Sequence, residues 1–180
     1  MDTLQMMRNR LEEKRHNEEF QKIESILQEG FSESLGHLSR KVPFQAASVY
    51  CYIPHKEQLH KIADYGGGVN FIERIRFDHG YGISAWVAKK QAPIYLPDIH
   101  RGSRHGYRPI RSFLSMPIII HDELAGVMNF AHIEPNAFER PRLLMIKNYI
   151  ENVKPIFQLI MRIQKKYPLN RYEKENSTRR

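Results

Sequence analysis

Residues 77–138 decide the fold of this 180-residue chain, and they read FDHGYGISAWVAKKQAPIYLPDIHRGSRHGYRPIRSFLSMPIIIHDELAGVMNFAHIEPNAF. After Gly82, the residues Ile83, Trp86 and Val87 fall on one helical face, so a short amphipathic helix is predicted there. The rest of the stretch alternates between runs of β-forming residues and polar connections, which is typical of strands and loops. The pattern therefore predicts a sheet with one helix lying across it.

Three strands are predicted after this helix. A short one at 94–96 precedes a polar, arginine-rich loop at 98–111. Longer β-type runs at 112–120 and 124–133 surround a short polar connection, which is the pattern of a β-hairpin. We expect the loop to lie over the sheet and to leave a container for a small molecule there, instead of a plain core.

Four pieces of this stretch resemble the GAF domain family in their order and spacing: GYGISAWVA at 80–88, IYLPDIH at 94–100, RSFLSMP at 111–117 and GVMNFAHIEPNAF at 126–138. The resemblance covers about residues 31–165. It implies an α+β fold, in which an antiparallel sheet of about six strands has helices on both faces and long N- and C-terminal helices. It also implies a small-molecule pocket and a regulatory role, often in a dimer and commonly in the cytoplasm.

Composition and length favour a single globular domain with terminal extensions. Hydrophobic residues make up 41% and charged residues 27% of the chain, which is ordinary for such a domain. The first 20 residues are highly charged, so no secretory signal is predicted. No apolar run is long enough for a membrane span. Cys51 is the single cysteine, which excludes an internal disulfide and suits a reducing cytoplasm.

The formal net charge of +8 is concentrated in two segments. Residues 98–111 hold four arginines and one aspartate, and residues 162–180 hold seven Lys/Arg and two glutamates. Binding of nucleic acid favours a continuous basic face, and nothing in the sequence joins these two segments into one. We therefore predict no nucleic-acid partner and no membrane partner.

The N-terminal residues 2–40 are predicted to be helical, with an apolar stripe along one side. Gly30 is expected to weaken this helix and to mark a break. We divide the chain into a helical extension at 1–30, the GAF-like domain at 31–165 with its C-terminal helix, and a basic tail at 166–180 that we expect to be disordered. The remaining predicted strands are 47–53, 58–65 and 75–77.

The C-terminal helix carries apolar residues at alternating spacings of three and four. They are Leu143, Ile146, Ile150, Val153, Phe157 and Ile160. A second stripe borders them, formed by Leu144, Tyr149, Ile156 and Ile163. Pro155 lies inside the pattern and predicts a kink or one missing backbone bond. Two apolar surfaces favour one contact with the chain's own sheet and one with a second copy, hence a homodimer. The alternative is that both stripes belong to one core.

The predicted site binds a small, anionic ligand. The peptides at 82–84 lie at a helix N-terminus, which favours negative charge. Arginines at 101, 104, 108 and 111 add forked donors, and aromatic residues supply walls. The resemblance adds the segments 98–100 and 112–115 and Asn129, whose matching positions often face the cavity in this family. The candidate ligand-binding residues are Tyr52, Phe77, Ile83, Ser84, Trp86, Asp98, His100, Tyr107, Arg111, Ser112, Phe113, Ser115 and Asn129.

Arg111 is the best single candidate, because it starts a strand and can point inward from a fixed base. Each candidate has a plainer alternative: loop arginines are solvated in most proteins, Trp86 suits a core, and Asp98 suits a turn. The ligand and any cofactor stay unnamed at this stage. The principal rival is a ligand-free dimerisation module. A downstream signalling domain or protein partner is compatible with either function.

Enzyme and haem hypotheses find less support. One branch of the family reduces free methionine sulfoxide and needs a nucleophilic thiol and a resolving thiol, whereas Cys51 stands alone in a strand. Its alternation with Val49 and Ile53 predicts a small buried hydrophobe. We expect no enzyme and no metal site, because the histidines lack zinc-ligand spacing. A single axial haem ligand is a further alternative, for which the candidates are His79, His100 and His132.

Overall fold

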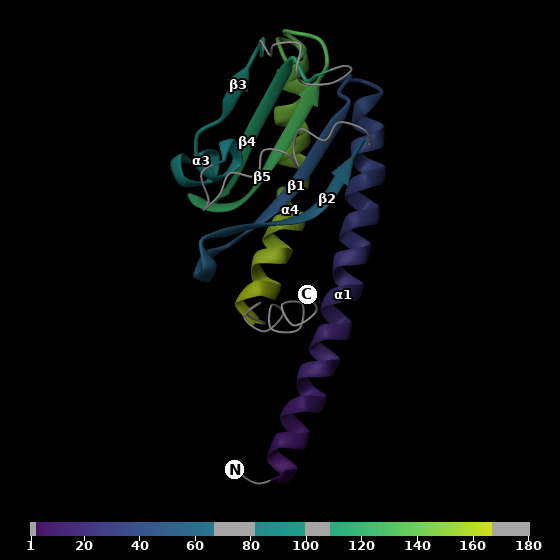
Figure 1. Cartoon of the computed structure of the whole chain (residues 1–180), viewed down its shortest axis with the longest axis vertical. Coiled ribbons are helices and arrows are strands. Elements are labelled where there is room, and N and C mark those ends of the chain that lie inside the picture. The colour runs from purple at the N-terminus through teal and green to yellow at the C-terminus, as the bar shows by residue number, and fades with distance from the viewer. Residues whose placement is uncertain (1–2, 67–81, 100–108, 167–180) are drawn as a thin grey trace.

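The computed structural model describes residues 3–66, 82–99 and 109–166, without the side chains of 3, 4, 6–20 and 166 (Figure 1). Five strands form one antiparallel sheet in the order β2-β1-β5-β4-β3. Their bounds are β1 Ala46–Ile53, β2 Gln58–Tyr65, β3 Ile94–Leu96, β4 Ser112–Ile120 and β5 Glu123–His132. The α+β class and the antiparallel sheet are thus confirmed. The strand predicted at 75–77 lies outside the described residues.

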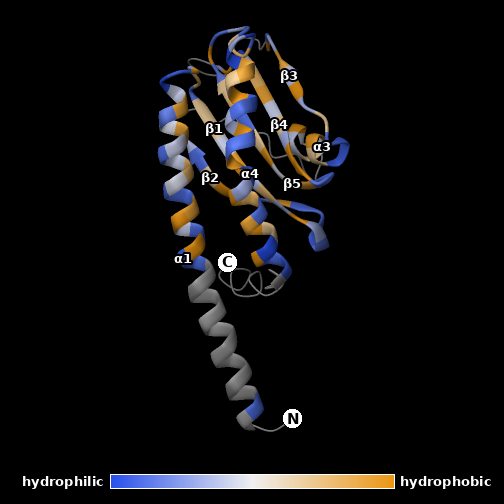
Figure 2. Cartoon of the chain, turned by 180° about the vertical axis from the view of Figure 1, so that it is seen from behind, coloured by the Kyte–Doolittle hydropathy of each residue, from blue (hydrophilic) through white to orange (hydrophobic). Residues whose placement is uncertain are grey.

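Helices cover both faces of the sheet, as predicted. Helices α1 (Thr3–Ser39) and α4 (Arg142–Lys166) lie on one face, and the short helix α3 (Ile83–Lys90) lies on the other (Figures 1 and 2). A single 3-10 turn, η1 (Pro54–Lys56), joins β1 to β2. The N-terminal half of α1 extends beyond the sheet (Figure 1). We name the two sides of the sheet the α1/α4 face and the α3 face.

The expectation that Gly30 breaks the first helix is wrong. Helix α1 runs without interruption from Thr3 to Ser39. Gly30 is exposed, and a Cβ atom there would meet nothing within 4 Å. A lone glycine only lowers helix propensity, by about 1 kcal/mol, and the packing of Phe31, Leu35 and Leu38 on the sheet outweighs that cost.

The α1/α4 face carries one continuous apolar core. Strand register aligns Val49, Met128 and Met116 across β1, β5 and β4, and all three lie in the same buried cluster. The predicted seam of α4 covers this cluster. Its buried members are Ile146, Ile150, Val153, Phe157 and Ile160. Helix α4 includes Pro155 without a break, since the proline is exposed and water can solvate the carbonyl left unpaired.

Gly126 in β5 allows α4 to approach the sheet closely. A Cβ atom at this position would lie 2.2 Å from the carbonyl oxygen of Tyr50 and 2.5 Å from Cε1 of Phe157. The fully buried ring of Phe157 occupies the space that a side chain at position 126 would need. Only glycine fits there without displacing that ring or the backbone. Helix α4 and the sheet are therefore in close contact at Gly126, with no space for a larger side chain.

The second stripe of α4 divides between core and surface. Tyr149 packs against the core, and its hydroxyl forms a hydrogen bond with Ser34 of α1. Leu144 and Ile156 are exposed, as are the nearby Met145 and Leu159. Across the described residues, no helix combines the length and the apolar character needed to span a membrane.

Candidate functional site

The α3 face differs from the opposite face because a polar row divides its apolar residues. Register aligns Ala46, Ala131 and Phe113 in one apolar row across β1, β5 and β4. Four residues away along each strand, Tyr50, Val127 and Pro117 form a second row. Buried Val127 belongs to a separate apolar cluster with Val87 of α3. Between these two rows lies a third one, which is polar.

Three buried polar residues form this row, which we call the polar row: Ser48, Asn129 and Ser115. Asn129 pairs with Ser48 on β1 and with Ser115 on β4. All three are at most 1% exposed. Asn129 Nδ2 donates hydrogen bonds to Ser48 Oγ at 3.2 Å and to Ser84 Oγ of α3 at 2.9 Å. The amide thus ties α3 to the sheet and uses both of its hydrogen atoms in doing so.

Two oxygen atoms of the polar row lack a hydrogen-bond partner. Among the residues that the structure describes, buried side-chain atoms without a partner are Asn129 Oδ1, Ser115 Oγ and the hydroxyl of Tyr95. Tyr95 stands apart, because it packs against Phe138 with the core of the α1/α4 face. Buried polar atoms are nearly always hydrogen-bonded in folded proteins. Two unsatisfied oxygens on directly paired residues make the polar row the candidate functional site.

The first turn of α3 lies beside the polar row. Gly82 caps the helix in an extended conformation and makes no side-chain capping hydrogen bond. The first amide groups of a helix have no carbonyl partner within it and favour an anion. Because Ser84 belongs to this turn and accepts the bond from Asn129, a direct hydrogen bond joins the start of the helix to the polar row.

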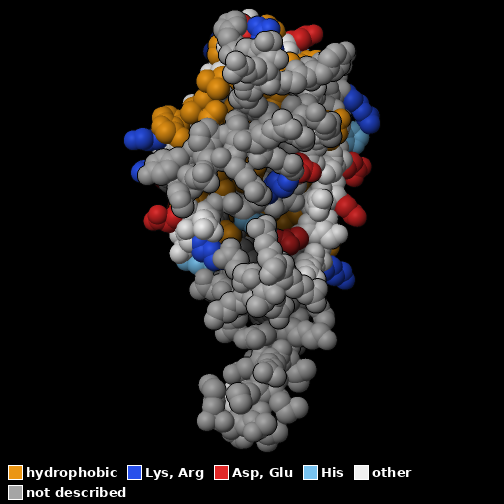
Figure 3. Space-filling view, viewed as in Figure 1, with side chains coloured by type: hydrophobic (Ala, Val, Ile, Leu, Met, Phe, Trp, Pro, Cys, Tyr) orange, Lys and Arg blue, Asp and Glu red, His pale blue; other side chains and the backbone are white. Residues whose placement is uncertain are grey.

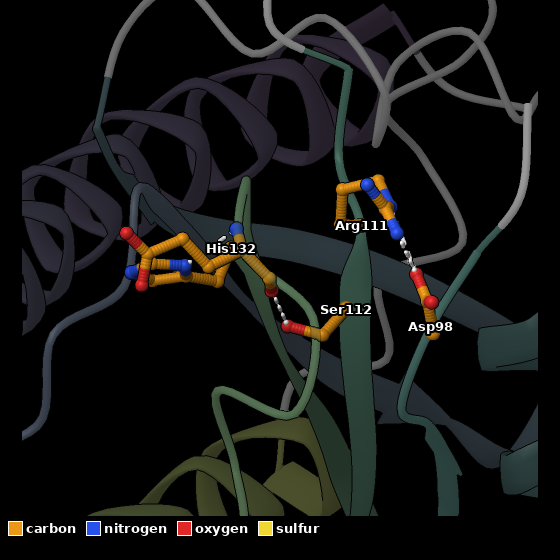
Figure 4. Close-up of polar contacts among 5 residues, drawn as sticks. Asp98, Arg111, Ser112 and His132 are labelled. Atoms are coloured by element: carbon orange, nitrogen blue, oxygen red, sulfur yellow. Dashed lines mark hydrogen bonds and ion pairs between the residues drawn. The ribbon is translucent and has the colours of Figure 1, made fainter.

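Arg111 is held by Asp98. Its Nε and terminal nitrogen lie 2.8 Å and 2.5 Å from Asp98 Oδ1. Backbone bonds add to this link, because the amide of Ile99 donates to the carbonyl of Arg111 at 2.6 Å. Figure 4 shows the two side chains pointing toward one another. The pair fixes the segment after β3 to the start of β4. It also neutralises the positive charge of Arg111, which was the reason for predicting this residue as an anion ligand.

Ser112 does not join the polar row, although it precedes Ser115 by only three residues. Alternation along β4 turns Ser112 to the same side as Leu114, toward the α1/α4 face. Its hydroxyl donates to the carbonyl of Glu134 at 2.8 Å. His132, the residue paired with it, accepts a hydrogen bond from the amide of Glu134 at Nδ1 (Figure 4). These contacts hold the end of β5 and the chain that follows it.

Burial lowers the pKa of His132 below its ordinary value of 6.5. Arg142 acts in the same direction, and the carboxylate of Glu134 opposes both. The neutral ring can accept the amide bond at Nδ1, whereas a protonated ring cannot. His132 thus acts as a neutral structural group on the α1/α4 face, away from the polar row, which removes one candidate for a haem ligand at this site.

The other predicted site residues divide into three groups. Tyr52, Ile83 and Phe113 belong to the apolar clusters beside the polar row. Trp86 is 46% exposed, so it fits neither the core nor a wall of this site. Hydrophobic side chains gather on the surface over α3 and β3 (Figure 3). Candidates outside the described residues are Phe77, His100, Tyr107 and the arginines 101, 104 and 108.

Ser48 is the site residue that the sequence did not reveal. It stands between Ala47 and Val49 inside a strongly apolar strand. Alternation along this strand places Ser48 on the face opposite Val49, which could have indicated a hydroxyl beneath α3. It was missed because serine is small enough to be tolerated in a core without further meaning.

Cys51 lies on the face opposite the polar row. It is buried with Val49 in the core of the α1/α4 face, which confirms the predicted environment. Burial raises the pKa of its thiol to about 12. A thiolate, the reactive form, is therefore not populated near neutral pH. Within the described ranges, no three His, Cys, Asp or Glu side chains gather in a way that could hold a metal ion.

The sheet order and the helices on both faces define an α+β domain built on an antiparallel sheet. A family model described as the GAF domain matches residues 24–146. Because this match spans more than half of the 180 residues, the chain belongs to the GAF domain family. Its homologues are sensory and regulatory domains. None of the curated proteins compared with the chain matches it.

Solved structures share this fold at low sequence identity. The GAF domain region of a protein from Geobacter sulfurreducens has a TM-score of 0.62 at 14% identity, over 78% of this chain and 99% of that one. A type II free methionine-R-sulfoxide reductase from Thermoplasma acidophilum has a TM-score of 0.58 at 14% identity, over 74% and 94%. The GAF domain of an Acinetobacter phosphoenolpyruvate-protein phosphotransferase has a TM-score of 0.56 at 13% identity, over 72% and 80%. Likeness at these identities concerns the fold alone.

Proposed function

We propose that this chain is a cytoplasmic regulatory domain that binds a small, anionic ligand on the α3 face and transmits the signal through the terminal helices of a homodimer. The observation that carries the proposal is the pair of buried oxygens without partners, Asn129 Oδ1 and Ser115 Oγ. An unsatisfied buried polar group costs about 1–3 kcal/mol. A domain that keeps two of them side by side gains that energy back when a guest supplies the missing hydrogen bonds.

The first turn of α3, which has no side-chain capping hydrogen bond, supports an anionic ligand. Its free amides lie next to the polar row through Ser84, and a negative group placed there would be stabilised by the helix dipole. Arg111 contributes less than the sequence led us to expect, because Asp98 already neutralises it. The proposed charge preference therefore depends on the backbone of α3.

The exposed apolar residues of α4 support the homodimer. Leu144, Met145, Ile156 and Leu159 lie on the side of the helix that its own core leaves uncovered. A second copy would bury them against the equivalent residues. Ligand binding would then shift the dimer through its different affinities for two helix arrangements, and a downstream signalling domain or protein could respond to that shift.

A non-enzymatic role agrees with the position of the single thiol. Cys51 is buried on the α1/α4 face with a pKa of about 12, whereas the polar row lies on the other side of the sheet. A reductase mechanism through this thiol would require the strand to turn over. An isolated free cysteine also suits the reducing cytoplasm.

Mass spectrometry of small molecules released from the purified protein tests the proposed function. Wild-type protein is expected to release an anionic metabolite, and the variant Asn129→Leu is expected to release none. Ser112→Ala, which alters a buried hydroxyl on the opposite face, should release as much as the wild type. If nothing is released and thermal shifts against panels of anionic metabolites stay flat, the chain is a ligand-free dimerisation module instead.

A further inference from the structure

We propose that the outer edge of β3 and the adjacent side of α3 bind an extended segment of a partner protein, which adds to the sheet as a further strand. The segment carries apolar residues at alternating positions, followed by carboxylates. This edge is separate from the polar row, so binding here does not require a ligand on the polar row.

Strand β3 is an open edge of the sheet in the described part of the chain. It ends the order β2-β1-β5-β4-β3 and pairs on its inner side with β4. The backbone of an antiparallel strand directs its N–H and C=O groups alternately to its two sides. The outer side of β3 therefore presents backbone groups that can bond to an added strand, which is a known mode of peptide recognition.

The opposite edge of the sheet, β2, is occupied by helix α1. The helix lies beside β2 (Figures 1 and 2) and is bonded to it. Ser32 Oγ donates to the carbonyl of Asp64 at 3.0 Å, and a carboxylate oxygen of Glu24 lies 2.6 Å from His60 Nε2. Of the two edges in the described sheet, β3 is thus the one available to a partner.

Two exposed prolines bracket the three residues of β3. They are Pro93 and Pro97. Proline has no N–H group and keeps an edge strand from pairing along a greater length. The carbonyl of Pro97 also accepts a hydrogen bond from the amide of Asn136 at 2.7 Å. The edge therefore suits a short segment and resists continuous stacking of sheets.

Trp86 lies on the side of α3 that faces this edge. Ser84 bonds to Asn129 of β5, so its side of the helix faces the middle of the sheet. Two residues along a helix are about 200° apart around its axis, which places Trp86 on the side toward β3. Its side chain is 46% exposed, within the hydrophobic surface over α3 and β3 (Figure 3). Tryptophan is enriched among the residues that dominate binding at protein interfaces.

Lys89 and Lys90 add positive charge at one end of this edge. Both are exposed and belong to the last turn of α3. In the described part of the chain neither forms an ion pair, whereas Lys61 does. The chain passes from this turn directly into β3, so the lysines lie near Ile94. An antiparallel guest runs from Leu96 toward Ile94, and its carboxylates therefore belong after its apolar residues.

The backbone edge favours a peptide over two other occupants. An anionic lipid surface matches the indole and the lysines, but its hydrocarbon has no groups that bond to a strand edge. A second copy of this chain would present its own β3 with the flanking prolines, residues 93–97. That segment contains no carboxylate, so the lysines would stay unpaired.

A synthetic peptide tests the proposal, with Trp86 as the reporter. The chain contains one tryptophan, so its fluorescence reports on this edge alone. The probe is acetyl-Val-Thr-Val-Thr-Glu-Glu-amide. One control peptide is methylated at the first four backbone nitrogens, which keeps the side chains and removes the donors. The other has glutamine in place of both glutamates. Each is titrated into the full chain while the emission of Trp86 is recorded.

The probe is expected to shift the emission of Trp86 to shorter wavelength, since the indole becomes covered. Backbone methylation should weaken binding by at least about tenfold, because the added strand loses its hydrogen bonds. Glutamine in place of glutamate should weaken it about three- to tenfold, as should the variant Lys89→Gln/Lys90→Gln. The matched control is Lys41→Gln/Lys147→Gln, which removes two exposed lysines elsewhere and should bind the probe like the wild type.

Equal binding of the probe and its methylated form would overturn the proposal, as would no shift at up to about 1 mM probe. Vesicles of phosphatidylglycerol are expected to leave the emission unchanged. A shift with these vesicles and none with the probe would identify a lipid-binding surface instead. A shift that appears only on raising the protein concentration would identify a second copy as the occupant, and it too would contradict the proposal.

Discussion

The two faces of this sheet use the same strands for different purposes. On the α1/α4 face one apolar cluster runs from α1 to α4 without interruption, and the buried serine and histidine at its edge, Ser112 and His132, both have hydrogen-bond partners. On the α3 face two smaller clusters flank a polar row, and two of its oxygens have none. Ser112 and His132 are buried, as are the three residues of the polar row, so depth does not distinguish the two faces. The α1/α4 face has one isolated unpaired hydroxyl, that of Tyr95, whereas the α3 face has two unpaired oxygens on directly paired residues.

The largest expected effect comes from disturbing the packed face. Gly126→Val places atoms where the carbonyl of Tyr50 and the ring of Phe157 already lie, so we expect a loss of about 3–5 kcal/mol in the free energy of unfolding. Urea denaturation followed by circular dichroism measures it. Gly30→Ala is the control: a Cβ there meets nothing, and stability should rise by about 0.5–1 kcal/mol. A well-tolerated Gly126→Val would mean that α4 is not packed tightly on the sheet.

A second prediction concerns the satisfied hydroxyl of the packed face. Ser112→Ala leaves the carbonyl of Glu134 without its side-chain donor, and we expect a loss of about 1–2 kcal/mol. Release of the ligand should not change. Denaturation and mass spectrometry of the same preparation check both parts. Loss of the ligand without loss of stability would place Ser112 in the site after all and would contradict the division of the faces.

A third, smaller effect is a dependence of stability on pH through His132. Burial lowers its folded-state pKa below 6.5, so near pH 6 the unfolded chain binds a proton that the folded chain resists. The stability contributed by the neutral ring is therefore present above pH 6.5 and is lost as the pH falls toward the lower folded value. Denaturation at a series of pH values measures this slope. It should flatten in His132→Gln and persist in His55→Gln, which alters an exposed histidine.

The smallest expected change in stability belongs to the unsatisfied hydroxyl of the α3 face. Without ligand, Ser115→Ala removes a buried group that makes no hydrogen bond, so stability should stay within about 1 kcal/mol of the wild type and rise if it moves at all. Tyr95→Phe should behave in the same way. The two variants should then differ in ligand binding, which only Ser115→Ala impairs. A loss of 2 kcal/mol or more in Ser115→Ala would show that its hydroxyl has a structural partner.

The fold could be predicted from the sequence because each element carried a strong local pattern. The strands at 58–65, 94–96 and 112–120 and the seam of α4 follow directly from hydrophobic periodicity. Gly30 was misjudged because tertiary packing on either side of it outweighs a local propensity. Trp86 was misjudged because helical spacing places a residue on a face without stating how far the face is covered.

The site was harder to predict, because its chemistry depends on which atoms remain unpaired. Asn129 and Ser115 were named as candidates, but so was Ser112, and only register and alternation separate them. We expected Arg111 to be available to a ligand, whereas Asp98, thirteen residues earlier, binds its side chain. Ser48 was not predicted because the sequence of one strand does not indicate which residue of the neighbouring strand pairs with it, here Asn129. Pairing between distant segments is the information that a linear pattern lacks.

A crystal structure at high resolution of the protein as purified from cells tests the central claim most directly. We predict electron density for a small organic molecule over the polar row, within hydrogen-bond distance of Asn129 Oδ1 and Ser115 Oγ. Density showing those two oxygens satisfied by the chain's own side chains, or a solid apolar packing over them, would contradict it and would leave the α3 face with no site.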